Sequence, residues 1–478
     1  MALLRNAAVA ITVCCASLAF DDVPLCEDDV GVPRFQLLQR SLSVMRGVRL
    51  DGRAPGRLAE WVGKNGNAIR SGSTMAVPPS VLATPSWTWT APNNQLVRSS
   101  PIVDAEGAIY VSTSAGELFK FSREGRQLWK RSFNHHVFAN PMYFENIYTL
   151  RDDCTFFALD AATGKTLWQK RAGHGSGPDT LTVIAAMDVV ISSCFGEGEG
   201  TTLGGSTTVV ALNATDGTIM WSFRADHPLY NWIGSIQEQS VLFSDQFGGT
   251  YRLNLWNGSV IWKVPPPSIT GLSTGGLASG MNGIVYVTSN HEEVPNFRSG
   301  FVSAYSVSDG SLIWRRNTSY AANAGAAVSA GTRPFVVVPT GPNPAMALQV
   351  GAKDWEKYNN TDDFRKPGKL VVLDAFGGHT LWEYDFPDWY GVAANDTFEH
   401  NCLPDSFANP AIAGDDSIYV VGESGQLYRF RDTDGDGKVT VRDEISSHST
   451  GNGFQGAPAI SDGILAIAPC NGLQVFLS

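Results

Sequence analysis

The residues with the clearest chemistry form an acidic loop, DTDGDGKVTVRD, at positions 432–443. Asp432, Asp434 and Asp436 place three carboxylates within five residues, and these charges repel one another unless a cation lies between them. Gly437 permits a sharp turn around a hard ion, and the Lys438 carbonyl adds an oxygen ligand. We therefore predict a Ca²⁺ site formed by Asp432, Asp434, Asp436, Lys438, Thr440 and Asp443.

The acidic loop differs from an EF-hand in two respects. Asp443 stands at position twelve, where an EF-hand has glutamate, and the flanking segments GQLYRF and KVTV are strand-like rather than helical. An acidic Asp-Gly turn also occurs in hairpins that bind no ion, so an ordinary turn is the competing interpretation. We expect a structural rather than a catalytic cation.

A second candidate site lies in the aromatic-rich segment at residues 383–410. Trp389, Tyr390, Phe398 and His400 stand beside the acidic Asp388 and Glu399, a combination that can line a pocket at the mouth of a ring and stack on a flat or sugar ligand. The competing interpretation is that these rings only pin a long loop onto the fold. We treat Trp389, Tyr390 and His400 as a candidate ligand surface.

A repeated hairpin must position these sites. FALDAATGKTLW, at residues 157–168, has the pattern of a short alternating strand, a polar turn closed by Gly164, and a second strand that ends in Trp168. One such unit cannot bury its own apolar face, so a series of them predicts a solenoid or propeller. Variants of the hairpin end at Trp129, Trp221, Trp262, Trp314 and Trp382.

The terminal positions of the repeat predict eight blades. We place the first at Trp89 and the last at Val441, where the tryptophan is lost. Residues 456–478 supply three strands without a fourth, and joining them to the N-terminal strand closes the ring and leaves no open sheet edge. The prediction is an all-β, eight-bladed β-propeller of four-stranded antiparallel blades at residues 84–478, closed by pairing of the N-terminal strand with the last three C-terminal strands.

Propeller topology places the long insertions on one face. The turns between second and third strands and the connections between blades emerge together, and the insertions at 196–206, 292–300, 341–367 and 385–408 all fall there. Elaborated loops on a rigid scaffold commonly carry function, so we expect a protein or carbohydrate partner on this face. The acidic loop falls on the opposite face.

Four cysteines and most histidines also fall on the face with the long loops. A transition-metal or active-site cluster is one interpretation, but a ring of radius greater than ~10 Å separates most of these side chains, so we favour ordinary polar connections. Cys154 and Cys194 belong to neighbouring blades, as do Cys402 and Cys470, and each pair can form a disulfide if its Cα atoms come within ~7 Å. The histidines on this face are His135, His136, His174, His227, His291, His400 and His448.

The repeat resembles that of the pyrroloquinoline-quinone (PQQ) repeat family. The eight-bladed propellers of this family carry an Ala-x-Asp-x-x-Thr-Gly-x-x-x-Trp docking motif, which Ala158, Asp160, Thr163, Gly164 and Trp168 match in full. The resemblance covers roughly residues 60–478. It implies the fold and leaves two activities open, because the family includes quinoprotein dehydrogenases and non-catalytic scaffolds such as the propeller subunit of bacterial outer-membrane assembly machinery.

The enzyme interpretation lacks parts that this resemblance requires. A quinoprotein dehydrogenase should have an adjacent cysteine pair over the quinone, a tryptophan beneath it, an aspartate base and Ca²⁺ ligands on the same face. The only adjacent cysteines are Cys14 and Cys15, near the N-terminus, and the acidic loop falls on the other face. We therefore favour a binding or assembly scaffold with structural Ca²⁺ over a PQQ- and Ca²⁺-dependent alcohol or sugar dehydrogenase.

The N-terminus has the pattern of a secretory signal peptide at residues 1–19. Arg5 precedes an apolar core at 7–15, which is well short of the ~20 residues that a spanning helix needs, so no membrane span is expected. Residues 20–83 have too few apolar residues for a separate domain, and we expect a leader or strap. A net charge of −11 argues against a nucleic-acid partner.

The predicted location is outside the cell or in the secretory-pathway lumen, or in the periplasm if the protein is bacterial. Five cysteines follow the signal peptide, at 26, 154, 194, 402 and 470, and this odd number predicts two disulfides and one free or intermolecular thiol. N-glycosylation in such a compartment is permitted at five sequons, Asn213, Asn257, Asn317, Asn359 and Asn395.

Overall fold

The computed structural model describes residues 58–137, 140–176, 182–196, 205–268, 270–291, 299–342, 365–397, 400–402, 404–439 and 442–478. All of them belong to one compact unit, 40–478. The predicted signal peptide, most of the predicted leader with Cys26, Asn359, Thr440 and most of the insertions at 196–206, 292–300 and 341–367 lie outside the described residues. Within the described residues, no helix is long and apolar enough to cross a membrane.

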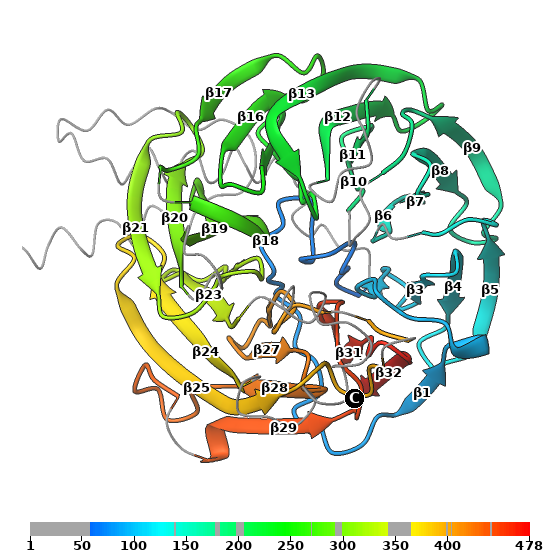
Figure 1. The fold of residues 1–478 in the computed structure, drawn as a ribbon. Coiled ribbons are helices and arrows are strands. Elements are labelled where there is room, and N and C mark those ends of the chain that lie inside the picture. Colours follow the sequence, from blue (N-terminus) through cyan, green and yellow to red (C-terminus); the bar gives the residue numbers. More distant parts are fainter. Residues whose placement is uncertain are drawn as a thin grey trace, which may run out of the picture. The chain divides into compact units, whose positions relative to one another are not determined.

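The strands form eight four-stranded antiparallel blades around a ring (Figure 1). Blades 1 to 4 are β2 (Ile102–Val103), β3 (Ile109–Thr113), β4 (Glu117–Phe121) and β5 (Gln127–Ser132); β6 (Met142–Phe144), β7 (Asn146–Leu150), β8 (Thr155–Leu159) and β9 (Thr166–Arg171); β10 (Ile184–Ala186), β11 (Val189–Cys194), β12 (Ser206–Asn213) and β13 (Ile219–Leu229); and β14 (Ser235–Gln237), β15 (Ser240–Ser244), β16 (Thr250–Asn254) and β17 (Val260–Val264).

The second half of the ring continues in the same way. Blades 5 to 8 are β18 (Thr270–Ser279), β19 (Ile284–His291), β20 (Gly300–Ser306) and β21 (Leu312–Thr318); β22 (Ala327–Val328), β23 (Phe335–Thr340), β24 (Arg365–Asp374) and β25 (Thr380–Tyr390); β26 (Ala411–Ile412), β27 (Ile418–Val421), β28 (Gln426–Phe430) and β29 (Ile445–Ser449); and β30 (Ala459–Ser461), β31 (Ile464–Ile467), β32 (Gly472–Leu477) and β1 (Trp87–Thr90). The described residues also form two short 3₁₀ helices, η1 (Pro92–Asn94) and η3 (Arg442–Glu444).

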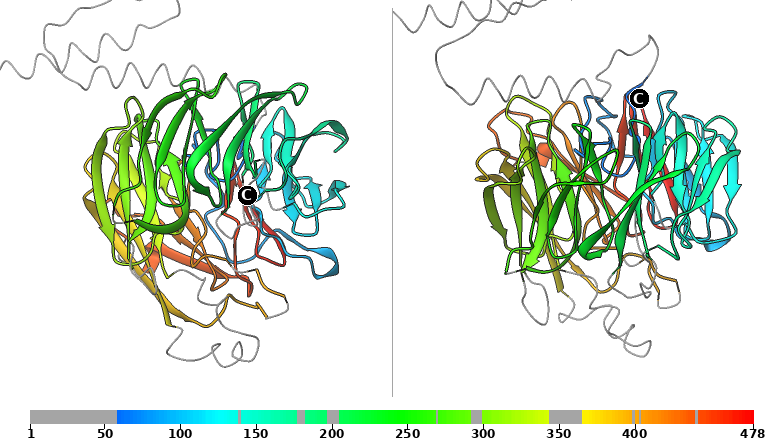
Figure 2. Two further views of the ribbon diagram at one scale, coloured as in Figure 1. Left: turned by 45° about the horizontal axis from the view of Figure 1, so that its top comes forward. Right: turned by 90° about the horizontal axis from the view of Figure 1, so that it is seen from above.

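Pairing between the N-terminal and C-terminal strands closes the ring. β1 pairs with β32, so that Trp87 lies opposite Val475, and the innermost strands β30 and β2 contact each other. The red C-terminal strands lie beside the blue N-terminal segment in Figure 1 and in the further views of Figure 2. The prediction of a closed eight-bladed propeller is confirmed.

The core lies between the blades. All residues of β3, β8 and β11 are buried, because neighbouring blades cover both faces of these middle strands. The outer strands are more exposed, as in β5. The ring of stacked blades has two faces. We call the one with the second-to-third turns and the blade-to-blade connections the loop face, and the other the turn face.

A tryptophan of the outer strand docks one blade on the next. The Trp168 indole Nε1 donates a hydrogen bond to the Ala214 carbonyl of the next blade at 2.8 Å. The Trp168 ring lies against Gly217, whose φ is +74°, and a Cβ there would come within 2.6 Å of the ring, so this packing requires glycine. The same indole hydrogen bond to the next blade is made by Trp87, Trp129, Trp221, Trp262 and Trp314.

The prediction that Trp89 fills the first terminal position is wrong. Trp87 donates to the Arg123 carbonyl at 2.7 Å and packs against Gly125, whereas Trp89 packs on the Phe119 ring at 4.7 Å. The two indoles are two residues apart on one strand and share a side of it. Because no turn precedes this strand in the chain, the sequence pattern does not fix its register.

The prediction that Val441 ends blade 7 is also wrong. Blades 2 and 7 can be aligned by the hydrogen bond that closes the turn before the outer strand. This bond runs from Asp160 N to Lys165 O in blade 2 and from Arg431 N to Glu444 O in blade 7. Ala158 pairs with Trp168 in blade 2, and the corresponding pair in blade 7 is Arg429 with Ser446. The outer strand β29 therefore begins after KVTV, and Val441 itself lies outside the described residues.

Candidate functional site

The centre of the ring holds residues 58–77, which we call the strap. It appears as the blue trace in the middle of Figure 1. Its backbone bonds to the innermost strands of blades 1, 4, 6 and 7 through the pairs Trp61–Val103, Ala68–Ile236, Ser71–Val328 and Thr74–Ile412. These bonds satisfy backbone groups that the innermost strands would otherwise present to the ring centre. The strap is therefore an integral part of the propeller.

Arg70 is the central polar residue of the strap and is 0% exposed. Its guanidinium donates to the carbonyl oxygens of Lys64, Val183 and Gly234. Burial lowers the pKa of Arg70 to about 9, so the side chain stays charged at pH 7. Asn65 is also fully buried and accepts a hydrogen bond from the Asn409 amide at 2.7 Å. These bonds fasten the strap to blades 3 and 4 and to the start of blade 7.

The described residues do not fit the quinone site that the family resemblance implies. That site requires adjacent cysteines, whereas the described cysteines form the disulfides Cys154–Cys194 and Cys402–Cys470. Trp61, Asn65 and Arg70 of the strap are fully buried at the ring centre. We therefore derive no redox step from these residues.

The two disulfides fasten the loop face, and both predictions are confirmed. Cys154–Cys194 joins blades 2 and 3 with a Cα–Cα distance of 5.8 Å. Cys402–Cys470 joins the connection that enters blade 7 to blade 8 with a Cα–Cα distance of 6.1 Å. Disulfides persist in oxidising compartments, so they agree with the predicted location.

An ion pair lies beside the first disulfide. The Arg151 guanidinium approaches the Asp153 carboxylate to 2.5 Å, and the Thr155 amide also donates to this carboxylate at 3.1 Å. Partial burial raises the pKa of Asp153, but the hydrogen bonds from Arg151 and Thr155 outweigh it and hold the pKa at about 2. Asp153 is therefore ionised throughout the physiological range.

The acidic loop joins β28 to β29 on the turn face. Asp432, Asp434 and Asp436 are exposed, as is Lys438. The Gly435 and Gly437 amides donate to the two Asp432 carboxylate oxygens at 2.7 and 2.8 Å. Both glycines have positive φ, which allows the backbone to wrap around the carboxylate.

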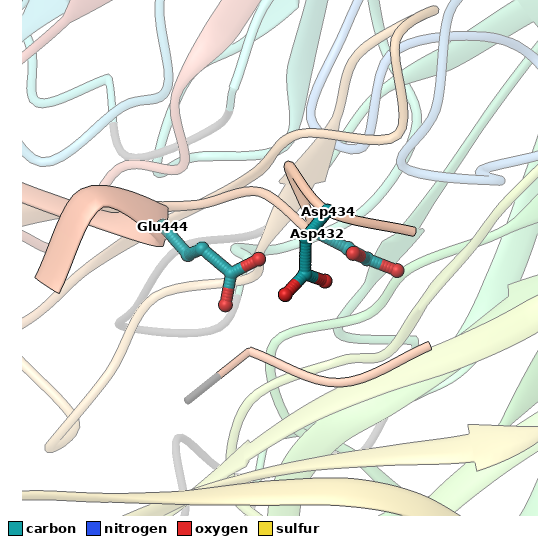
Figure 3. A group of neighbouring side chains, drawn as sticks. All are labelled: Asp432, Asp434 and Glu444. Carbon is teal, nitrogen blue, oxygen red and sulfur yellow. The ribbon is translucent and has the colours of Figure 1, made fainter. Parts of the chain in front are cut away.

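Three carboxylate groups of the acidic loop converge (Figure 3). Oxygens of Asp432, Asp434 and Glu444 all lie within 4.8 Å of one another. Glu444 is buried and accepts a hydrogen bond from the Thr433 amide at 2.8 Å. Oxygen ligands of this type suit Ca²⁺. Asp443 is exposed and does not belong to this group, so the structure brings together Asp432 and Asp434 from the predicted set and adds Glu444.

A cavity of about 350 Å³ lies on the loop face between blades 6 and 7. Phe386, Trp389, Phe407 and Tyr428 contribute aromatic rings to its wall. The Phe386 ring centroid lies 4.5 Å from that of Phe407 and 5.1 Å from that of Tyr428. A Cβ on Gly368 would come within 2.6 Å of the Phe407 ring, so glycine is needed for this packing. We call this cavity the aromatic pocket.

Charged groups around the aromatic pocket are paired. Lys366 Nζ lies 2.5 Å from Glu423 Oε2, and both side chains are largely buried. Arg365 Nε lies 2.6 Å from Asp388 Oδ2, and the hydrogen bond to the Asp388 carboxylate raises the pKa of Arg365. Each pair joins one positive and one negative charge, so the pocket attracts neither cations nor anions strongly.

Only one of the three residues of the predicted ligand surface lines the aromatic pocket. Trp389 does so, and its Nε1 donates to the Val392 carbonyl at 2.8 Å. Tyr390 is 39% exposed at the end of β25. The His400 carbonyl accepts a hydrogen bond from the Thr397 amide, and the His400 amide donates to the Thr397 hydroxyl.

The sequence does not point to the other aromatic residues of the pocket. Phe386 and Phe407 lie within the aromatic-rich segment but are not among the predicted ligand residues, and Tyr428 lies in the next blade. The β-strand alternation of FPDWY places Phe386 and Trp389 on different sides of an ideal strand, so the sequence pattern argues against both residues lining one pocket. A register shift between β24 and β25 next to Phe386 brings them to one cavity.

The histidines on the loop face contact separate partners. His135 Nδ1 lies 3.2 Å from Asp152, His227 packs on the Phe247 ring, and His448 Nε2 lies 3.0 Å from Gln474. Within the described residues, the one set of three or more metal-binding side chains is the acidic group of Figure 3. The geometry of these histidines agrees with ordinary polar connections.

Four sequons fall within the described residues. Asn257, Asn317 and Asn395 are exposed, and Asn213 is half-buried, with its side-chain oxygen bonded to the Thr215 amide at 2.7 Å. A glycan needs an accessible amide nitrogen. The exposed three remain predicted glycosylation positions, and a glycan on Asn395 would replace the hydrogen bond from its Nδ2 to Asn452 Oδ1 at 2.9 Å.

Comparison with protein families gives a match over most of the chain. A family model described as "Outer membrane protein assembly factor BamB" matches residues 82–222, 194–335 and 246–469. A BamB of Nitrosomonas eutropha is 25% identical over 227 residues, which cover 46% of this chain and 51% of that protein. A quinoprotein ethanol dehydrogenase of Pseudomonas putida is 28% identical over 113 residues, 21% of this chain and 18% of the dehydrogenase. The chain thus matches about half of the first relative and less than a fifth of the second.

Solved structures share the fold. BamB from Moraxella catarrhalis has a TM-score of 0.55 at 13% identity, with 83% of this chain and 98% of that one covered. A quinohemoprotein alcohol dehydrogenase from Comamonas testosteroni has a TM-score of 0.60 at 14% identity, with 92% and 84% covered. At these identities the likeness concerns the fold alone.

Proposed function

This chain belongs to the PQQ-repeat β-propeller family, and on that premise we propose that it works as a non-catalytic binding and assembly scaffold with a structural Ca²⁺ ion. The competing proposal, to which the resemblance to an ethanol dehydrogenase points, is a quinoprotein dehydrogenase that oxidises an alcohol or sugar with PQQ and Ca²⁺.

The strap carries the scaffold proposal. Fully buried Trp61, Asn65 and Arg70 lie at the ring centre, and Arg70 already uses its donors on three backbone carbonyls. A cofactor placed there would have to displace these bonds, and each buried group left unpaired costs on the order of 1–3 kcal/mol. The buried strap therefore supports a structural rather than a cofactor-binding role for the centre of the ring.

The proposed partner is a protein bound on the loop face. Two disulfides hold this face, and rigid presentation of surface groups lowers the ordering cost of binding. The relative's name, an outer membrane protein assembly factor, supports a protein partner. We propose that the scaffold works in the periplasm or, in a eukaryote, in the secretory-pathway lumen or outside the cell.

A PQQ titration separates the two functions. We expect Ca²⁺-loaded protein to show no saturable change in quinone absorption and no dye-linked oxidation of ethanol or glucose after PQQ is added. Stoichiometric PQQ binding accompanied by turnover would overturn the scaffold proposal.

A capture experiment tests the partner face. Tyr390 on the loop face and Trp256 on the turn face are 39% and 42% exposed, which makes them a matched pair. Tyr390→Arg should weaken capture of the protein partner from the native source, whereas Trp256→Arg should leave it unchanged. Equal loss in both variants, or loss only with Trp256→Arg, would contradict the proposed face.

A further inference from the structure

The aromatic pocket combines two kinds of wall. Phe386, Phe407 and Tyr428 form a contiguous aromatic surface, with centroid distances of 4.5 and 5.1 Å from Phe386 to the other two. Trp389 adds an indole whose Nε1 is already bonded to Val392, so its ring contributes a face rather than a hydrogen-bond donor. Such surfaces stack on the C–H faces of flat, ring-shaped ligands.

The rest of the lining is polar. Ser424 and Gln426 are half-exposed. Neither side chain makes a hydrogen bond to another described residue, so both can bond to a ligand. Lys366 and Glu423 also line the pocket, as a 2.5 Å ion pair that keeps further donors and acceptors. Burial raises the pKa of Tyr428 to about 12, so its hydroxyl keeps its proton at neutral pH.

From this juxtaposition we propose that the aromatic pocket binds a neutral saccharide, with one sugar ring against the aromatic wall and its hydroxyl groups bonded to the polar rim. The volume of about 350 Å³ falls in the range of small-ligand sites and accommodates one or two sugar rings. The paired charges of Lys366–Glu423 and Arg365–Asp388 favour a neutral ligand.

The polar rim favours a saccharide over an apolar side chain of a protein. An inserted apolar anchor would strip water from Ser424 and Gln426 without replacing the hydrogen bonds to that water, at a cost of roughly 1–3 kcal/mol for each unpaired group. Sugar hydroxyls both donate and accept, so they replace that water. The site lies between two blades rather than at the ring centre, and it stands independently of any quinone or protein partner.

Calorimetric titration of the intact protein tests the proposal. The probes are glucose, N-acetylglucosamine, cellobiose, maltose and chitobiose, each to about 20 mM, which is enough to saturate a site with a Kd of about 1 mM. We expect saturable binding of at least one, with quenching of tryptophan fluorescence. Absence of saturable binding for all five would overturn the proposal, as would displacement of a bound sugar by a neutral Trp-containing tetrapeptide that binds more tightly.

Matched variants locate the site. Trp389→Ala should weaken saccharide binding about tenfold through loss of stacking, and Gln426→Ala should weaken it several-fold. Trp256→Ala, an exposed indole on the turn face, is the control and should bind unchanged. If Trp389→Ala unfolds the chain, Gln426→Ala alone decides. Unchanged binding in Gln426→Ala would place the saccharide elsewhere and contradict the assignment.

Discussion

On the turn face, six indoles repeat one docking hydrogen bond, each to a backbone carbonyl of the next blade. On the loop face, the links differ from one another: Cys402 forms a disulfide with Cys470, whereas the Phe386 ring packs on Phe407 and Tyr428. The turn face is thus assembled from repeated units. The loop face depends on individual links that occur once.

This difference has a consequence for stability. When one docking tryptophan is removed, the docking of the other blades stays intact, because each repeat touches only the adjacent ones. A single link on the loop face has no duplicate. We therefore expect the largest losses of stability from changes on the loop face and smaller, local losses on the turn face.

Removal of a disulfide should have the largest effect. The Cys402→Ser/Cys470→Ser double variant should lower the free energy of unfolding by about 4 kcal/mol, because the bridge restricts a 68-residue loop in the unfolded chain. Chemical denaturation measures this loss. The Cys154–Cys194 bridge closes only a 40-residue loop, so the Cys154→Ser/Cys194→Ser variant should lose roughly 0.5 kcal/mol less. Losses below about 1 kcal/mol in both would show that the loop face does not depend on these links.

Ca²⁺ binding gives the next largest effect and concerns blade 7, where Ser446 stands at the position of the docking tryptophan. At a Ca²⁺ concentration of about one hundred times Kd, the free energy of unfolding should rise by about 2.7 kcal/mol, visible as a higher melting temperature. Asp434→Asn should abolish this rise, because it removes one of the three converging carboxylates. An unchanged melting temperature for the wild-type protein would remove the Ca²⁺ proposal.

Two neighbouring acids distinguish the ligand set of the structure from that of the sequence. Glu444→Gln should lose the Ca²⁺-dependent rise, since Glu444 is buried and converges with Asp432 and Asp434. Asp443→Asn should keep it, since this side chain is exposed and outside the group. The opposite result would favour the ligand set predicted from the sequence, which includes Asp443 and not Glu444.

The two faces also differ in how far the sequence predicts them. The strand-turn-strand repeat predicts eight blades, ring closure and the docking role of Trp168, because these depend on local spacing. Register at the ring closure was not predictable, since Trp87 and Trp89 are equivalent in pattern and no preceding turn fixes them. The aromatic pocket was predicted only through Trp389, because strand alternation separates Phe386 from Trp389 and Tyr428 reaches the pocket from the next blade through tertiary packing.

A glycine substitution on the turn face should have a moderate effect. A Cβ on Gly378 would come within 2.5 Å of the Trp314 ring, and the φ of +67° is unfavourable for alanine. Gly378→Ala should therefore cost about 2 kcal/mol by chemical denaturation. Gly283→Ala is the control, because Gly283 has a φ of +75° and nothing within 4 Å of its added Cβ. It should cost about 1 kcal/mol, so equal costs would mean that the close approach of the indole contributes nothing.

Protonation of Asp153 should give the smallest effect, on the loop face beside the first disulfide. Its pKa of about 2 lies below the usual value of 3.8, so the stability from its bonds with Arg151 and Thr155 is fully present above about pH 4 and is lost as the pH falls through about 2. The melting temperature of the wild-type protein should exceed that of Asp153→Asn at pH 6, and the gap should close towards pH 2. Because the pair is partly exposed, salt screens the attraction, and the gap at pH 6 should narrow in 1 M NaCl. A gap that stays constant from pH 6 to pH 2 would show that the asparagine acts through packing rather than through lost charge.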